Sequence, residues 1–379
     1  MTGQTYDIAI IGGGIMGCVS SLELAEAGMS VALFEQRFLA SSASGVNAGT
    51  LSLTGVRSAL SPYALRSIDL WQKLSERLGY DIHYRRIGSV MAAFTDREAE
   101  ILTERVQAKS QQGVSLELID AKKARELEPA LSEDVKLAAF SPIGGYANSS
   151  ATGRAFTLAL RRAGVAIHEQ SPVTRIERKG DGFEVTSSTG VMVHARRIVM
   201  AGGSWLGGLG QMVGVDFPVK WRVSQVSVTE RLPKSVKRVV AHAYGLLTLK
   251  QSENGTILIG GGWQGKGDLE RGPSEVLPQN LVGNLQLAMR TIPILKTTRI
   301  VRTWLGLHAH TPDAMPIIGP IPGVENAFVL GGVRAGFTCG PYIGKLFADI
   351  LLGKEPELPL FHAPFNPARF NALSMAKAG

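Results

Sequence analysis

Residues 6–35 read YDIAIIGGGIMGCVSSLELAEAGMSVALFE, and this stretch decides the fold. Residues 6–11 form a nearly continuous apolar run, which is typical of a strand buried on both faces of a parallel sheet. After the three-glycine turn, residues 15–27 have the small and apolar residues of a helix that packs on a strand. Residues 30–34 predict a second buried strand. Together these elements make one βαβ unit of the expected length, about 30 residues.

The glycines of this unit have the spacing of a dinucleotide-binding turn. Gly12 permits the tight turn, Gly14 lets a diphosphate approach the backbone, and Gly17 allows the helix to pack closely on the strand. The diphosphate then meets free N–H groups at the start of the helix. Glu35 ends the second strand and is placed to accept hydrogen bonds from a ribose hydroxyl. Glycine-rich turns alone are common, but the strand, the helix and the acid together predict dinucleotide binding.

Three later segments favour FAD over NAD. Residues 41–49 follow Glu35 directly and offer hydroxyls and backbone amides to a diphosphate and to the ring system beyond it. Residues 201–203, Ala-Gly-Gly, end a buried strand with room for close approach. Residues 331–336 join another buried strand to a helix. The N-terminus of that helix, beside the ring, would stabilise negative charge on reduced flavin.

The composition is that of an ordinary globular protein, with 45% apolar and 19% charged residues. A length of 379 residues suggests two or three domains, at roughly 150 residues each. The net charge of +8 is spread over isolated basic pairs. We therefore expect scattered solvated charge and no nucleic-acid partner, with a general attraction for anionic substrates as the alternative. No signal peptide or apolar run of about 18 residues occurs, which predicts no membrane insertion. The two cysteines lack metal spacing, which predicts no metal site and a reducing, cytoplasmic location.

Beyond residue 35, nucleotide-binding elements alternate with a region rich in strands. We expect helices at 62–79, 96–112, 120–127, 152–163, 278–291 and 340–352, and strands at 90–94, 165–168, 173–177, 183–187, 191–195, 197–201, 225–229, 245–250, 256–260 and 327–330. Residues 40–49 are expected to be a flexible loop. The predicted fold class is α/β: a doubly wound, Rossmann-like FAD-binding domain built from separated segments, with a second, α+β, sheet-rich substrate domain. The predicted limits are 1–80, 141–215 and 300–379 for the FAD-binding domain, and 81–140 and 216–299 for the substrate domain.

Five separated motifs resemble, in the same order, the D-amino acid oxidase superfamily of flavoenzymes, in the branch with glycine oxidase and sarcosine oxidase. The resemblance implies FAD on the doubly wound domain, a sheet-rich domain that covers the flavin ring, and oxidation of a C–N bond. It extends over nearly the whole chain. The motifs are residues 12–17 with Glu35, 43–49, 199–203, 303–319 and 331–340.

The resemblance also implies which residues hold FAD. Glu35 and Gln36 would hold the adenosine ribose, and Val173 would hold adenine through its backbone. Residues 42–49 would hold the pyrophosphate and the ring, and residues around 201 and 336 would line the remaining cofactor surface. The full predicted set is Gly12, Gly14, Ile15, Met16, Gly17, Glu35, Gln36, Ser42, Ser44, Asn47, Ala48, Gly49, Val173, Ala201, Gly202, Gly306, Gly332, Arg334, Gly336, Phe337 and Thr338.

On the substrate side the chain departs from the family at His308. Glycine-oxidase-like members commonly carry an arginine there, which clamps the substrate carboxylate as a fork. A histidine can hold an anion, with fewer donors and a charge that depends on pH. We predict catalytic or binding roles for His308, His310 and Arg334, the last of which matches an arginine that lies beside flavin and substrate. The alternatives are ordinary loop or core histidines and, for Arg334, a structural ion pair.

Two further positions bear on the flavin chemistry that the resemblance implies. Monomeric sarcosine oxidases bond their flavin covalently through a cysteine where this chain has Gly306, so we expect FAD to be bound non-covalently. Those oxidases also carry a lysine that helps oxygen to react. The matching residue here is Leu258, which favours a dehydrogenase that passes electrons elsewhere. Nothing around Cys339 lowers a thiol pKa, so we do not expect a nucleophile there.

The implied reaction is hydride transfer from the Cα of a neutral amine to flavin N5, which gives an imine and needs no dedicated acid or base. In its length and at His308 the chain is most similar to the flavoprotein subunits of opine oxidase, cyanide synthase and hydroxyproline dehydrogenase. This similarity implies an amino acid, imino acid or opine-like N-substituted amino acid as substrate, with partner subunits and an electron acceptor. One alternative is an FAD-dependent hydroxy-acid or polyol dehydrogenase with His308 or His310 as its base. Another is a non-catalytic flavin subunit that relays electrons.

Overall fold

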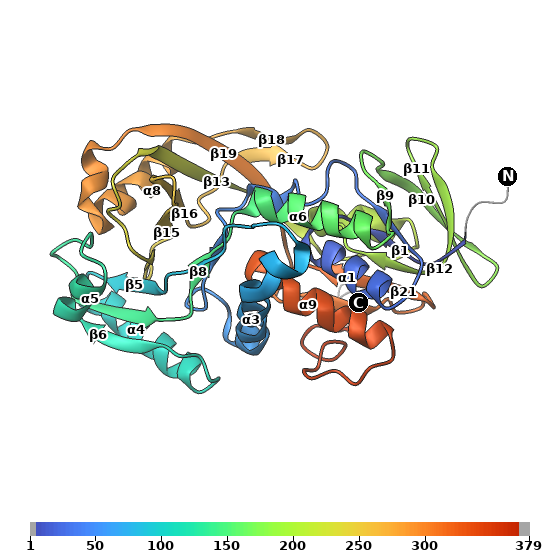
Figure 1. Cartoon of the computed structure of the whole chain (residues 1–379), viewed down its shortest axis with the longest axis horizontal. Helices are drawn as coiled ribbons and strands as arrows, with labels where there is room; N and C mark the ends of the chain where they lie inside the picture. Colours follow the sequence, from blue (N-terminus) through green and yellow to red (C-terminus); the bar gives the residue numbers. More distant parts are fainter. Residues whose placement is uncertain (1–4, 371–379) are drawn as a thin grey trace, which may run out of the picture.

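Two large sheets dominate the computed structural model, which describes residues 5–370. In Figure 1 the sheet built around β1 (Thr5–Ile11) lies on the right and the second sheet lies on the left. A small three-stranded sheet with β8 at its centre lies between them, and its strands are β3 (Thr50–Leu51), β8 (Gly145–Tyr146) and β4 (Arg85–Arg86).

The first sheet has β1 at its centre, with β12 (Met192–Met200) and β2 (Val31–Phe34) parallel to it on either side. The four residues of β2 and most of those in β1 are buried, which explains their continuous apolar run. On the side of β12 away from β1, a hairpin of two antiparallel strands forms one edge of the sheet. The other strands are β9 (Ala166–His168), β10 (Val173–Lys179), β11 (Gly182–Ser187), β20 (Ile317–Pro320) and β21 (Ala327–Gly331).

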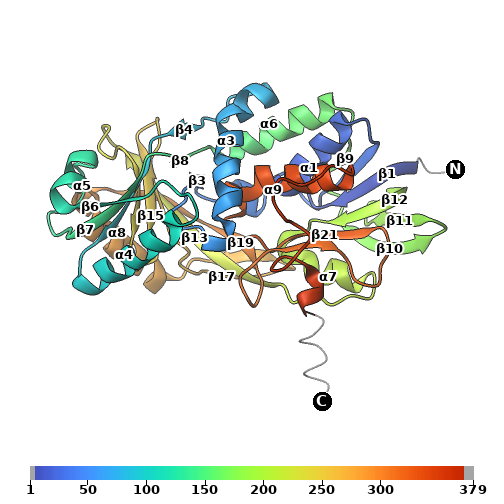
Figure 2. The ribbon, with the colours of Figure 1, turned by 90° about the horizontal axis from the view of Figure 1, so that it is seen from below.

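Three helices cover one face of this sheet, and a fourth packs on two of them, as Figure 2 shows. Helix α1 (Ile15–Glu26) packs against α9 (Gly336–Leu351), which also packs against α3 (Ser61–Leu78). Helix α6 (Ser149–Arg162) lies beside α1 and α3. Their apolar side chains form one core with the strands beneath them, so the N-terminal βαβ unit is held by a helix from the far end of the chain.

Helix α9 contains a proline at position 341, and side chains of α3 compensate for it. Proline has no N–H and disturbs the backbone hydrogen bonds of the preceding turn. The indole N–H of Trp71 donates to the carbonyl of Thr338 at 3.1 Å, and the hydroxyl of Ser67 accepts from the N–H of Tyr342 at 3.3 Å. The first turn of α9 is therefore fixed by α3 as well as by its own backbone.

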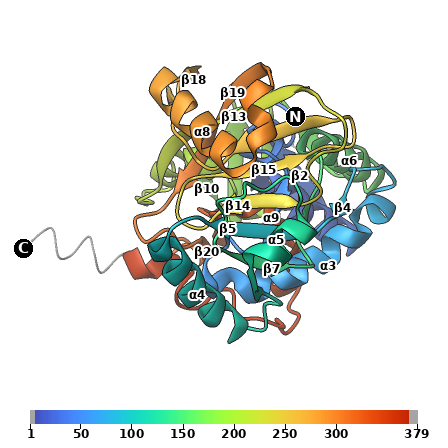
Figure 3. The ribbon, with the colours of Figure 1, turned by 90° about the vertical axis from the view of Figure 1, so that its left-hand side faces the viewer.

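The second sheet is mixed and has eight strands, in the order β19-β13-β16-β15-β14-β5-β7-β6. Helices α5 (Ala121–Leu127) and α8 (Pro278–Thr291) cover its outer face over an apolar core of their own (Figure 3). The strands are β5 (Ser89–Ala93), β6 (Glu117–Asp120), β7 (Leu137–Ser141), β13 (Lys220–Arg231), β14 (Val239–His242), β15 (Thr248–Gln251), β16 (Thr256–Gly260) and β19 (Ile300–His310), and the remaining elements are α4 (Asp96–Ser110), α7 (Leu206–Gln211), β17 (Lys266–Asp268) and β18 (Gly272–Glu275).

The α/β fold class is confirmed, and most expected elements are present within a few residues of their predicted limits. The six expected helices are observed as α3, α4, α5, α6, α8 and α9. Helix α9 begins at Gly336 rather than 340, because Ala335 adopts a left-handed conformation with φ of 62° and opens the helix there. Helix α6 begins at Ser149 because the Asn148 side chain caps it, accepting from the N–H of Ala151 at 2.9 Å.

Three local expectations are wrong. Residues 191–195 and 197–201 form one continuous strand, β12, because its first half pairs with β11 and its second half with β1. The segment expected as a flexible loop contains a short helix, α2 (Ala43–Val46). Several strands are present where none was expected, among them β6, β7, β14, β19 and β20. Strand β19 pairs with β13 along its whole length and thus lies in the second sheet, although our division groups residue 300 onward with the FAD-binding segments. The division into domains otherwise stays a prediction.

Candidate functional site

The turn between β1 and α1 has the close backbone approach that its glycines predict. Gly12 has a φ of 121°, and a Cβ atom at this position would lie 2.3 Å from the carbonyl oxygen of Ala201. A Cβ atom on Gly17 would lie 2.1 Å from the carbonyl oxygen of Gly12. Any side chain at either position would therefore push α1 or β12 out of place.

The start of α1 is open. Gly14 is the N-cap residue of α1 and supplies no side-chain hydrogen bond. The N–H of Ile15 donates to the hydroxyl of Ser44 at 3.0 Å, and a Cβ atom on Gly14 would lie no closer than 3.5 Å to that hydroxyl. The first turn of the helix thus presents backbone N–H groups and the positive end of the helix dipole toward residues 41–49. This arrangement suits an anionic group such as a diphosphate.

The carboxylate of Glu35 is buried beside this turn. Its Oε2 accepts from the N–H of Gly13 at 2.9 Å, and its Oε1 accepts from the N–H of Arg37 at 2.8 Å. Burial raises the pKa of Glu35, while these two hydrogen bonds act in the opposite direction. Each carboxylate oxygen has a second lone pair, so Glu35 can accept further hydrogen bonds from ribose hydroxyls. Val173, the predicted adenine contact, begins β10, and nearby Ser171 donates its N–H to the Glu35 carbonyl at 2.9 Å.

The segment 41–49 is held in place by its own side chains. The Asn47 amide donates to the carbonyls of Ala43 and Ser44 at 3.0 and 2.7 Å, and its Oδ1 accepts from the N–H of Gly49 at 2.7 Å. A Cβ atom on Gly49 would lie 2.0 Å from the carbonyl oxygen of Ala147. The segment therefore follows a fixed path from the start of α1 toward the second sheet.

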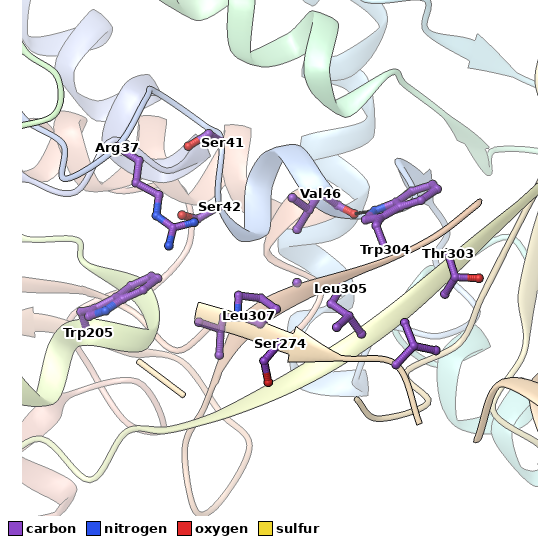
Figure 4. A pocket seen from close by; sticks show the side chains of 13 residues that line it. Arg37, Ser41, Ser42, Val46, Trp205, Ser274, Thr303, Trp304, Leu305 and Leu307 are labelled. Carbon is purple, nitrogen blue, oxygen red and sulfur yellow. Dashed lines mark hydrogen bonds between the residues drawn. The ribbon is translucent and has the colours of Figure 1, made fainter. Parts of the chain in front are cut away.

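A cavity of about 390 Å³ lies between this segment and β19. Arg37, Ser41 and Ser42 line it from one side, and Leu305 and Leu307 from the other (Figure 4). Its lining includes Ser42 and Gly306, two of the predicted cofactor contacts.

Helix α2 packs directly on β19 beside that cavity. The indole of Trp304 donates to the carbonyl of Val46 at 2.7 Å. A Cβ atom on Gly306 would lie 2.3 Å from Cγ2 of Val46. Gly306 thus leaves room for Val46, which gives a physical reason for glycine at the position where a cysteine would form a covalent flavin bond.

One face of the second sheet turns toward residues 46–50, and we call it the inner face. Successive residues of a strand point to opposite faces, and residues paired across strands point to the same face. A Cβ atom on Gly260 would contact Val226, Thr248 and Ala48, which places these four together. By register, the inner face comprises Thr248 and Lys250 of β15, Leu258 and Gly260 of β16, Lys220, Arg222, Ser224, Val226 and Val228 of β13, and Arg302, Trp304, Gly306, His308 and His310 of β19.

His308 and His310 lie at one end of the inner face. Nε2 of His308 is 3.0 Å from the hydroxyl of Ser224. Burial lowers the pKa of His308, and the positive charges of Arg334 and Arg222 lower it further. Burial and cationic neighbours also lower the pKa of His310. Both rings are therefore mainly neutral at pH 7, so they can form hydrogen bonds but carry little charge for a carboxylate.

Arg334 lies on the turn between β21 and α9, and its charge acts on both histidine rings. Its side chain is exposed and forms no salt bridge within residues 5–370. The part of the chain that the structure describes thus offers no carboxylate partner for it. An unpaired guanidinium near the inner face suits a carboxylate ligand.

Comparison with known proteins identifies the family. A family model described as FAD dependent oxidoreductase (DAO) matches residues 7–350. A glycine oxidase of Geobacillus kaustophilus is 30% identical, over 96% of this chain and 97% of that one. The chain belongs to the FAD-dependent oxidoreductase (DAO) family. The sarcosine oxidase subunit beta of an Arthrobacter species is 26% identical, over 97% of this chain and 91% of that one.

Solved structures agree with this assignment. The glycine oxidase of Geobacillus kaustophilus matches with a TM-score of 0.88 and 28% identity, covering 96% of this chain and 99% of that one. An L-proline dehydrogenase from P. horikoshii also gives a TM-score of 0.88, at 26% identity, covering 98% of this chain and 99% of that one. The expected resemblance is thus confirmed, and so are the fold class and the type of cofactor.

FAD is the cofactor of this oxidoreductase family, and the described residues fit it. The open start of α1 suits the diphosphate, and the free lone pairs of Glu35 suit the ribose. Thr338 at the start of α9 donates its hydroxyl to the carbonyl of Thr50 at 3.3 Å, so the helix start reaches the strand after Gly49. The assignment of individual residues to FAD stays a prediction.

The structure brings several of the predicted FAD contacts close together, and others lie on neighbouring elements. Ile15 and Met16 lie beside Gly340 of α9, and Gly12 lies against Ala201 and Gly202. The ring of Phe337 packs on Trp71, with their centroids 4.8 Å apart. Gln36 follows Glu35 on the way to the 41–49 segment. Gly332 adopts a φ of 68°, and a Cβ atom there would lie 2.8 Å from Cγ2 of Thr311.

Neither a metal site nor a membrane span is found among the residues that the structure describes. Within residues 5–370, no group of three His, Cys, Asp or Glu side chains could hold a metal ion. Over the same residues, no helix combines the length and apolarity that a membrane span requires.

Sequence reasoning missed Lys250. This lysine lies on the inner face, opposite Leu258 in the register of β15 and β16. Its side chain is buried, and its amine donates to the hydroxyl of Thr50 at 2.9 Å. Burial lowers the pKa of Lys250 to about 7. Strand β15 thus supplies an amine beside Leu258, the position where the oxidases have a lysine. This amine is also close to the predicted flavin contacts Gly49 and Thr338.

Replacing Lys250 with methionine is expected to stabilise the apoprotein at pH 7, by on the order of 3 kcal/mol. The pKa of Lys250 is about 7 when folded, against 10.5 for an ordinary lysine. The charge on Lys250 therefore lowers the free energy of unfolding. This cost grows as the pH falls from 10.5 to 7 and reaches its full size below pH 7. Urea unfolding of both proteins at several pH values is the measurement. The stabilisation is expected to be largest at or below pH 7 and absent above pH 10.5.

Lys109 offers a matched control for this prediction. It is also a buried lysine, with its pKa lowered to about 8, but it donates to two carbonyls, those of Leu53 and Val56. Lys109→Met leaves both carbonyls without this donor and is expected to destabilise the protein by about 2 kcal/mol. Equal destabilisation by both substitutions would show that Lys250 is a structural residue like Lys109.

Proposed function

We propose that this oxidoreductase oxidises a C–N bond of an amino acid, an imino acid or an opine-like N-substituted amino acid. The observation that carries this proposal is the unpaired guanidinium of Arg334 near the inner face of the second sheet, because it can bind the carboxylate of such a substrate. The reaction itself requires no dedicated acid or base, because amine oxidation proceeds by hydride transfer.

In the proposed mechanism the protein mainly binds, orients and shields the substrate. Arg334 holds the carboxylate and so fixes the position of the Cα–H bond. When bound, FAD supplies the acceptor for the hydride of that bond, at N5. His308, neutral at pH 7 and 3.0 Å from the hydroxyl of Ser224, offers hydrogen bonds to the substrate. Lys250, with a pKa of about 7, can hold or release a proton close to the same face.

The proposal extends to the cofactor bond and to the electron acceptor. We propose that FAD is held non-covalently, since Gly306 leaves room for Val46 and offers no thiol. The sequence similarity to flavoprotein subunits supports partner subunits and a separate acceptor. A buried amine at Lys250 is an argument for oxygen as acceptor, whereas Leu258 favours a separate acceptor. Reoxidation of the reduced enzyme by air, compared with reoxidation by an artificial acceptor, decides between them.

Anaerobic reduction tests the proposal directly. The FAD-loaded chain is mixed without oxygen with glycine, sarcosine, D-amino acids, proline analogues and N-carboxyalkyl amino acids, and the flavin band near ~450 nm is followed. We expect bleaching by at least one of these amines. Dithionite serves as the control that the bound flavin can be reduced. Bleaching by dithionite and by no amine, with and without copurifying partner chains, would contradict the proposal.

A hydroxy-acid or polyol dehydrogenase is the second candidate, and the pKa of His308 favours it. Alcohol oxidation needs a base that takes the hydroxyl proton, and a histidine that stays neutral at pH 7 can serve as one. Lactate and glycerol 3-phosphate belong in the same anaerobic panel for this reason. Bleaching by these compounds and by no amine, lost in His308→Ala, would favour this second function.

A further inference from the structure

The end of the inner face that carries the two histidines is unusually cationic. Arg222 lies directly opposite His308 in the register of β13 and β19, and Lys220 lies opposite His310. Because paired residues share a face, both cations stand beside the imidazole rings. Their charges act on the rings as well, since Arg222 lowers the pKa of both histidines and Lys220 that of His310.

Two more cations reach the same place from other parts of the chain. Arg334 acts on both rings from the turn before α9, and Arg57 acts on His310 from the segment after β3. The side chains of all four are exposed, and none forms a salt bridge within residues 5–370. The charges acting most strongly on His308 and His310 are thus all positive. Such a group repels itself until an anion neutralises it.

One carboxylate does not account for this arrangement. A substrate carboxylate on Arg334 occupies one guanidinium as a fork and leaves the cations on β13 unmatched. Arg222 and Arg334 come from different elements and both act on the His308 ring, so a ligand held by both would need two separate negative groups.

We propose that Arg222, assisted by Lys220, binds a second carboxylate, so that the preferred substrates are amines with two carboxylates. This inference rests on the proposed function, in which Arg334 binds the first carboxylate. Because the two arginines come from separate elements, we favour a secondary amine whose carboxylates flank the nitrogen, as in an N-carboxyalkyl amino acid. An acidic amino acid carries the same two groups on one side of its amine.

Two inert ligands that differ by one carboxylate test the second site without turnover. Thiodiacetate has two carboxylates and methylthioacetate has one, and sulfur replaces the amine nitrogen in both. Their dissociation constants are measured from the change they cause in the visible spectrum of bound FAD. We expect thiodiacetate to bind the wild-type enzyme about tenfold more tightly. Arg222→Gln is expected to raise the dissociation constant of thiodiacetate about tenfold and that of methylthioacetate less than twofold.

Arg302→Gln is the matched control. Arg302 is an exposed arginine of β19, the strand that carries His308, and it pairs with Val228, six residues from His308 in the register. It is expected to change neither constant. Equal binding of thiodiacetate to Arg222→Gln and wild type would overturn the second site. If Arg334→Gln then failed to bind either ligand, although Arg222→Gln bound thiodiacetate normally, the proposed function would stand. If no amine reduced the flavin, the proposed function itself would fail.

A substrate comparison then identifies the kind of dicarboxylate. Iminodiacetate, aspartate, glutamate and sarcosine are compared in the anaerobic assay with wild type and Arg222→Gln. We expect iminodiacetate to reduce the flavin faster than sarcosine, and the advantage to disappear in the variant. Faster reduction by aspartate or glutamate than by iminodiacetate would overturn the flanking arrangement and assign the second site to an acidic side chain.

Discussion

Replacing Gly14 with alanine is expected to weaken FAD binding about 100-fold, or about 2.7 kcal/mol, and to leave the apoprotein folded. Gly14 has an ordinary extended conformation, with φ of −69°, and an added Cβ atom would lie 3.5 Å from the nearest atom outside its neighbours. The folded chain can therefore accept a methyl group there. The diphosphate cannot, because it needs the space next to the first N–H groups of α1.

The measurement is the dissociation constant of FAD for the apoprotein, from quenching of flavin fluorescence, together with the midpoint of thermal unfolding without cofactor. Gly55→Ala is the control, since a Cβ atom on Gly55 would meet nothing within 4 Å. It is expected to change neither quantity. Unchanged FAD affinity in Gly14→Ala would show that the diphosphate does not approach α1 at this residue.

Replacing Arg334 with glutamine is expected to lower kcat/KM for the best amine substrate about 100- to 1000-fold, with FAD content unchanged. Arg334 has no carboxylate partner among residues 5–370, and we propose that the substrate supplies one. Losing the guanidinium fork removes two parallel hydrogen bonds as well as the charge. Arg334→Lys is expected to recover part of the rate, because lysine keeps the charge but not the fork.

Steady-state kinetics and the ratio of flavin to protein absorbance measure these two effects separately. Arg299→Gln serves as the control: Arg299 is exposed and lies just before β19, at the opposite end of that strand from His308. A loss of FAD in Arg334→Gln would place this arginine on the cofactor rather than on the substrate. A kcat/KM within threefold of wild type would contradict both roles.

The cofactor half of the site could be predicted from the sequence because its determinants are local. The turn, the helix start and the acid that ends β2 all lie within residues 12–35, where spacing alone carries the geometry. The structure adds physical reasons for the glycines, such as the carbonyl of Ala201 that a side chain on Gly12 would strike. The roles of the individual FAD contacts nevertheless stay predictions.

The substrate half could not be predicted in the same way, because it depends on the pairing of distant strands. Strand β19 could not be predicted because its inner-face residues, among them Gly306, His308 and His310, lack the apolar pattern of an ordinary strand. Lys250 stands beside Leu258 only through the register of β15 and β16. Arg222 meets His308 by the same kind of long-range pairing. These pairings follow from tertiary packing and not from local propensity.

The order of strands in the first sheet also constrains how the enzyme matures during synthesis. Strand β1 is made first, yet its neighbour β12 is made only after residue 192, and α9, which packs on α1, begins at Gly336. A ribosome that has reached β20 has not yet made the helix whose start borders the predicted flavin site. The growing chain therefore lacks part of the predicted flavin site until α9 has been made, so tight binding of FAD must wait for this helix.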